Sequence, residues 1–126
     1  MITEDYVSFE TAKLLKEKGY EGVIKAYYHI WDNGNRVCSV QEFIHSEAQH
    51  LYFPAPTLQM AMKWLREKHN LHIGVLITYQ YFPRKYEVHI MHTEKYEDIV
   101  VNPGTNFNTN EEACESAIRY TLENLI

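Results

Sequence analysis

Seven histidines make a metal site the first chemistry to examine in this sequence. The closest pairs, His69 with His72 and His89 with His92, are each three positions apart. The first pair is split between the end of a predicted helix and the start of a predicted strand. The second pair lies along one predicted strand, where an odd separation places the two imidazoles on opposite faces of the sheet. We therefore expect no metal site and no other cofactor.

Nucleophilic catalysis has equally little support from the residue pattern. The sequence contains no Gly-x-Ser-x-Gly elbow, and its five glycines are too scattered to form a phosphate-binding loop. Cys38 has no motif around it, and Cys114 falls on the apolar stripe of a predicted helix, where a small side chain packs. These patterns favour a protein that is not an enzyme. A hydrolase or transferase without a recognised motif is kept as an alternative.

The residues best suited to binding lie at the tip of a predicted hairpin. The tip, residues 81–86, contains Tyr81, Phe82, Arg84 and Lys85. Aromatic rings beside two cations suit a nucleotide, a nucleic acid or a protein partner. The alternative is that the two rings pack back onto the sheet, so that only Arg84 and Lys85 face water.

Three amphipathic helices are predicted from apolar residues that recur three and four positions apart. They are expected over residues 9–18, over residues 58–70 and from residue 110 onward, with Ser8, Thr57 and Thr109 as their N-caps. Gly19 and Asn70 are suited to end the first two helices, because both residue types tolerate a positive φ. On the last helix Glu115 and Arg119 are expected to form an outward-facing ion pair.

Two hairpins are predicted between these helices. The dipeptide Asn33-Gly34 favours a two-residue turn that pairs Ile30 with Val37. Residues 71–79 and 86–92 each alternate between two sets of side chains, which predicts a second hairpin. Its expected register pairs Tyr79 with Tyr86, Ile77 with Val88 and Val75 with Ile90, with Ile77 and Val88 buried. The sequence therefore predicts an α+β fold, an antiparallel sheet of two hairpins packed with three helices in the order α-β-β-α-β-β-α.

The middle helix carries a second apolar flank. One stripe, which includes Leu58, Ala61 and Leu65, is enough to pack the helix on a sheet. Met60 and Trp64 lie on a different flank, and both residue types are typical of protein interfaces. We expect this flank to form the interface of a homodimer. The alternative is that the segment 41–53 or the first helix covers it within one chain.

Three segments, residues 6–19, 55–70 and 111–126, cover the predicted helices and little of the sheet. They resemble small uncharacterised proteins of gut Bacteroides-type bacteria and their phages. The middle segment, which begins Ala-Pro-Thr-Leu-Gln-Met-Ala-Met-Lys-Trp-Leu, is the most specific of the three. The resemblance implies an origin in a phage or another mobile element. It brings no known activity, cofactor or catalytic residue.

Length and composition set the remaining expectations. With 126 residues, of which 45% are hydrophobic, the chain is expected to form one domain over residues 1–126. Its net charge of −5 disfavours nonspecific binding to nucleic acids. It has neither an apolar run long enough to span a membrane nor a secretory signal at its start. We therefore expect a cytoplasmic protein with no membrane partner.

Together these features predict a non-enzymatic binding or accessory protein that acts as a homodimer. Its further partner is a protein or a nucleotide whose identity the sequence does not specify. The alternative function is binding or sequestration of a nucleotide or nucleic acid through the hairpin tip, residues 81–86.

Overall fold

The computed structural model describes residues 2–22, 26–31, 36–37, 52–78, 85–95, 97–101 and 107–126. These residues form the helices α1 (Phe9–Glu17), α2 (Leu58–His69) and α3 (Asn110–Asn124). They also form the strands β1 (Tyr27–Trp31), β2 (Arg36–Val37), β3 (Tyr52–Pro54), β4 (Leu71–Ile77), β5 (Tyr86–His92) and β6 (Glu97–Val101). The predicted α+β class and the helix–hairpin–helix–hairpin–helix order are confirmed. Each hairpin gains a third strand, β3 in the first and β6 in the second.

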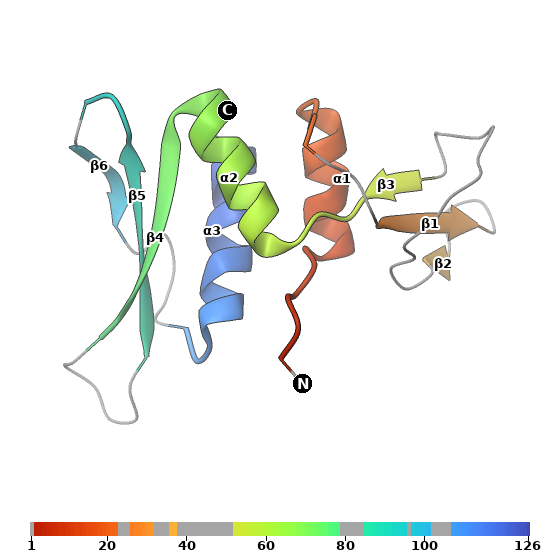
Figure 1. Ribbon diagram of the computed structural model, residues 1–126, viewed down its shortest axis with the longest axis horizontal. Helices are drawn as coiled ribbons and strands as arrows, with labels where there is room; N and C mark the ends of the chain where they lie inside the picture. Colours follow the sequence, from red (N-terminus) through yellow and green to blue (C-terminus); the bar gives the residue numbers. More distant parts are fainter. Residues whose placement is uncertain are drawn as a thin grey trace.

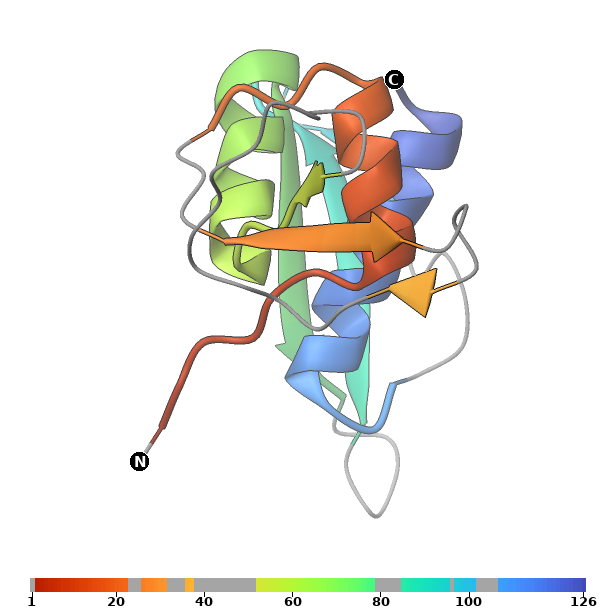
Figure 2. The same cartoon turned by 90° about the vertical axis from the view of Figure 1, so that its right-hand side faces the viewer.

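The helices form a layer between two antiparallel sheets (Figure 1). One sheet has the strand order β4-β5-β6, and both α2 and α3 pack against it. The other sheet has the order β2-β1-β3 and lies beyond α1, which contacts both β3 and α3 (Figure 2). The two predicted hairpins therefore belong to separate sheets on opposite sides of the helices.

The helix ends agree with the predicted capping residues. Ser8, Thr57 and Thr109 each accept a hydrogen bond from the backbone amide three residues later. Gly19 and Asn70 have φ angles of 79° and 57°, the left-handed conformation that commonly follows a helix. The carbonyl of Asn70 also accepts a hydrogen bond from Thr93 N (2.9 Å), so α2 passes into the β4–β5 ladder without a loop. Within the described part of the chain, no helix has the length and apolar composition that a membrane span requires.

The β4–β5 hairpin is antiparallel as predicted, but its predicted register is wrong by two residues. Ile73 pairs with Ile90, Val75 with Val88 and Ile77 with Tyr86. A shift of two residues keeps every side chain on its predicted face, so the alternating pattern fits both registers equally well. Burial distinguishes the registers. Val88 and Ile90 are fully buried, whereas Ile77, which was expected to be buried, is 42% exposed at the end of β4.

The third strand of each sheet is the main addition to the predicted fold. β1 carries the predicted Ile30–Val37 pair on one side and pairs with β3 on the other. β6 pairs with β5 beyond a short turn. β3 ends in Pro54 and β6 begins with Glu97 and Asp98, residue types that are depleted in strands. The other residues of the two strands, Tyr52 and Phe53 in β3 and Ile99, Val100 and Val101 in β6, are aromatic or β-branched types that favour strands, and pairing with β1 and β5 extends the strands over the unfavourable positions.

The hydrophobic core lies between the helices and the β4-β5-β6 sheet. Its largest fully buried aliphatic side chains are Val7, Leu15, Leu65, Val88, Ile90, Ile118 and Leu122. Ala61 on α2 and Ala117 on α3 are fully buried too. Small side chains on contacting helices allow the close approach of α2 and α3.

Candidate binding site

The N-terminal segment runs antiparallel to the chain that enters α2. Val7 N donates a hydrogen bond to Pro56 O (3.0 Å), and an isolated bridge joins Tyr6 to Thr57. The residue before a proline is held in an extended conformation, which suits this pairing. Residues 3–6 are thereby positioned beside the first turn of α2.

A recess of about 410 Å³ lies between this segment and α2. Its lining residues are Glu4, Tyr6, Ala26, Ala55, Pro56, Thr57 and Met60. Tyr6 is 39% exposed and Met60 is half-buried, whereas the two alanines are almost completely buried. We refer to this feature as the Tyr6–Met60 recess. Its volume and its largely apolar lining are typical of small binding sites.

Two further hollows share Glu4 with the Tyr6–Met60 recess. One is bordered by residues 3–6 and Thr57, and the other extends to Glu111 and Cys114 at the start of α3. The charged side chains that line the three hollows, among the described residues, are the carboxylates of Glu4, Asp5 and Glu111. The site therefore combines an apolar recess with an acidic border.

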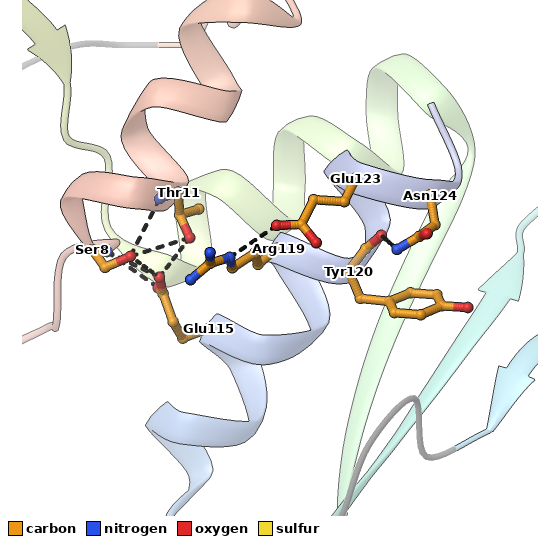
Figure 3. Close-up of polar contacts among 7 residues, drawn as sticks. All are labelled: Ser8, Thr11, Glu115, Arg119, Tyr120, Glu123 and Asn124. Atoms are coloured by element: carbon orange, nitrogen blue, oxygen red, sulfur yellow. Dashed lines mark hydrogen bonds and ion pairs between the residues drawn. The ribbon is translucent and has the colours of Figure 1, made fainter.

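The carboxylate of Glu115 on α3 caps the first turn of α1 (Figure 3). It accepts hydrogen bonds from Ser8 Oγ, from Ser8 N (3.1 Å) and from Thr11 Oγ1 (2.6 Å). A carboxylate here satisfies a backbone amide that the helix leaves unpaired and interacts favourably with the positive end of the helix dipole. Arg119, expected to pair with Glu115, instead donates to Glu123 Oε1 (2.9 Å). The cluster holds α1 against α3, which is a structural role.

Cys114 lines the hollow at the start of α3. It is 2% exposed, and its thiol donates to Asn110 Oδ1 (3.4 Å). Burial, together with the nearby carboxylates of Glu111 and Glu115, raises the pKa of the Cys114 thiol to about 11. The thiol is therefore protonated at neutral pH and is not poised for attack as a thiolate.

The predicted hairpin-tip site is only partly covered by the structure. Tyr81, Phe82 and Arg84 lie outside the described residues. Lys85 is described, and its Nζ donates a hydrogen bond to Asn108 Oδ1, close to the start of α3. Binding through the tip stays a prediction.

Met60 and Trp64, predicted to share a dimer interface, lie in different surroundings. Met60 lines the Tyr6–Met60 recess. Trp64 is only 7% exposed, and its ring centroid lies 5.4 Å from that of Tyr20 and 4.8 Å from that of His69. The prediction that Trp64 is an exposed interface residue is wrong, because Tyr20, just beyond α1, covers it within the same chain.

The histidine pairs do not converge on a common point. His89 Nε2 lies 3.5 Å from Glu87 Oε1, and His92 Nδ1 accepts from Glu94 N (3.3 Å). Among the residues that the structure describes, no three His, Cys, Asp or Glu side chains are grouped as metal ligands. Metal independence remains a prediction for the whole chain.

Comparison of the chain with protein-family models, with curated proteins and with solved structures finds no match. The candidate site is therefore defined by its geometry. Of its residues the sequence singled out Met60 and missed Glu4 and Tyr6. The only local signal for these two is the pair of prolines before α2, which predicts an extended segment able to pair with another stretch of chain.

Proposed function

We propose that this chain is a non-enzymatic binding protein that recognises a protein partner through the Tyr6–Met60 recess. The proposal depends on one observation: the exposed Tyr6 and the half-buried Met60 line the same recess as the buried alanines Ala26 and Ala55. Tyrosine and methionine are enriched in protein interfaces, and hot-spot residues cluster where water is excluded. A methionine side chain also adapts to the shape of its partner.

The homodimer expected from the sequence is a rival occupant of the same surface. Met60 is the member of the expected interface that stays accessible once Trp64 is buried. The resemblance of the helical segments supports an origin in a phage or mobile element, and a partner in the cytoplasm of the host cell fits both proposals.

Site-specific photo-cross-linking distinguishes these occupants. A benzophenone amino acid replaces Met60, or as a matched control Lys63, which is exposed on the same helix. In the organism that encodes the chain, we expect a cross-link to a partner protein from position 60, none from position 63, and its loss on Tyr6→Ala. A cross-link between two copies would identify the homodimer instead. No cross-link from position 60 would contradict the proposed function.

A further inference from the structure

We infer that the occupant of the Tyr6–Met60 recess is a lysine or arginine side chain within a basic segment of the partner protein. This inference rests on the proposed function and specifies the chemistry of its partner. It is supported by the charge around the recess, by the residues that line it, and by two neighbouring hollows that share Glu4 with it.

The charge around the recess favours a cation. Glu4 lines the recess and both adjoining hollows, Asp5 lines two of the three cavities, and Glu111 lines one. The N-terminal ends of α2 and α3 meet the same region, and each contributes about half a positive charge. Three carboxylates exceed these two helix ends by about two negative charges. The region therefore attracts cationic groups and repels acidic ones.

The lining of the recess suits the stem as well as the charge of such a side chain. Lysine and arginine bury their methylene groups on apolar surface while the charged end reaches a polar group. Met60 supplies apolar surface, and Tyr6 supplies an exposed ring in a cavity that Glu4 also lines. A ring and a carboxylate bind a cation together, by cation–π attraction and ion pairing. A cation–π contact of this kind occurs elsewhere in the protein, where Lys16 Nζ lies 4.6 Å from the centre of the Phe53 ring.

The extent of the site favours a peptide segment over a single small cation. The recess of about 410 Å³, the hollow beside residues 3–6 and the hollow at the start of α3 all have Glu4 in their lining, so the three cavities lie around one residue. Side chains along an extended peptide can occupy successive hollows, and cationic ones would meet a carboxylate in each. A simple ion would fill one position and leave the apolar recess empty.

Methyl NMR of the full chain tests the inference directly. Methionine methyl groups are labelled with ¹³C, the Met60 signal is assigned with Met60→Leu, and the buried Met62 provides an internal reference. The probe is an acetylated, amidated tetra-arginine peptide, with tetra-glutamate as its matched control. We expect saturable shifts of Met60 with tetra-arginine, little change at Met62, and weaker binding as NaCl rises from about 0.05 M to about 0.5 M.

Variants of the acidic border provide the second measurement. The double variant Glu4→Gln/Asp5→Asn should weaken tetra-arginine binding about fivefold or more. The matched control, Glu94→Gln/Glu97→Gln, removes two exposed carboxylates from the β5–β6 turn and β6 and should leave the affinity unchanged. The melting temperature of each variant verifies that the fold is intact.

Several outcomes would overturn the inference. They are a Met60 signal that does not move, one that moves equally with tetra-glutamate, or an equal loss of affinity in both double variants. Cross-linking from position 60 without a response to tetra-arginine would remove the cationic partner and leave the proposed function standing. The absence of cross-linking would remove the proposed function whatever the peptide does.

Discussion

The two sheets are attached to the helix layer by different kinds of contact. On the β4-β5-β6 side, aliphatic side chains such as Val88 and Ile90 are fully buried, and α2 and α3 pack against the sheet. On the β2-β1-β3 side the strands have two, five and three residues, and aromatic rings make the contact with α1. The Phe9 ring centroid lies 5.7 Å from that of Tyr28 and 5.3 Å from that of Phe53.

This difference shows how stability is distributed over the molecule. Long strands with an aliphatic face spread their packing over many side chains, so the loss of one leaves the others in place. Among the described residues, the short strands are attached by a few aromatic rings, by Tyr28 Oη, which donates to Val7 O (2.6 Å), and by Lys16, whose Nζ donates to Tyr52 O (2.8 Å). We therefore expect the β2-β1-β3 sheet to open locally at a lower free energy than the β4-β5-β6 sheet.

The largest expected effect comes from the aliphatic side. Ile90→Ala should lower the free energy of unfolding by about 4 kcal/mol, because it leaves a cavity at a fully buried position in the central strand. Urea denaturation measures the change. The control, Ile99→Ala, alters a side chain on β6 that is 40% exposed and should cost below about 1 kcal/mol. Equal losses in the two variants would contradict the packing described for this sheet.

A smaller effect is expected on the aromatic side. Phe9→Ala should cost about 2 kcal/mol, since Phe9 is only partly buried but its ring contacts both β1 and β3. Hydrogen exchange should accelerate in β1 and β3 while the amides of β4 and β5 keep their protection. Equal acceleration in both sheets would show that the two regions open together, and the comparison would then fail.

The connection between the two regions depends on Glu115. Glu115→Gln should cost about 1.5 kcal/mol, because an amide in place of the carboxylate weakens hydrogen bonds from Ser8 and Thr11 to a charged acceptor. Thermal unfolding measures the loss. Glu123→Gln removes only a surface ion pair with Arg119 and should cost about 0.5 kcal/mol or less. An effect of Glu115→Gln no larger than this control would show that the cluster does not hold α1.

Alkaline pH should lower the free energy of unfolding through ionisation of Cys114, which is buried on α3. The folded-state pKa of its thiol is about 11, above the ordinary value of 9.0, so the unfolded chain releases a proton that the folded chain retains. The contribution of the protonated Cys114 thiol to the free energy of unfolding is therefore complete below about pH 9 and is lost as the pH rises toward 11. At a pH of about 9.5 the loss should be about 1 kcal/mol. Urea titrations of the wild type and of Cys114→Ala at two pH values isolate it, and parallel pH dependence of the two proteins would contradict the assignment.

The smallest effect is expected from metal removal. The predicted histidine pairs do not converge in the described residues, and the packing already described accounts for the attachment of both sheets. Dialysis against a strong chelator should change the melting temperature by no more than about two degrees. A large decrease that zinc restores would reveal ligands brought together elsewhere in the chain.

Local chemistry made the helices predictable from the sequence. Ser8 and Thr57 cap helices through their own hydroxyls, and Asn70 ends α2 through its own backbone conformation, so the information lies within a few residues. The register of β4–β5 was less predictable, because alternation fixes the face of a side chain and leaves shifts of two residues open. The pairing of Ile73 with Ile90 follows from burial against the helices.

The candidate site was predictable only at Met60, which the helical periodicity places off the main stripe. Tyr6 and Glu4 join it because the N-terminal segment pairs with residues about fifty positions later. Trp64 was assigned to an interface although it is buried. Helical periodicity places it away from the sheet-facing stripe but does not reveal that Tyr20 covers it. Contacts between distant segments decided both outcomes, and the sequence near each residue does not identify its partner.

The junction at Asn70 has a consequence for the order of folding. Its carbonyl accepts a hydrogen bond from Thr93 N next to the pair formed by Leu71 and His92, so the C-cap residue of α2 is bonded directly to the end of the β4–β5 hairpin. A single residue separates α2 from β4, so we expect that unfolding of the last turn of α2 also disrupts the start of the β4–β5 hairpin. We expect α2, β4 and β5 to form a cooperative unit whose contacts are close in sequence and so form quickly. Such a unit would serve as a template on which the N-terminal segment docks, and the recess would take shape only at that later step.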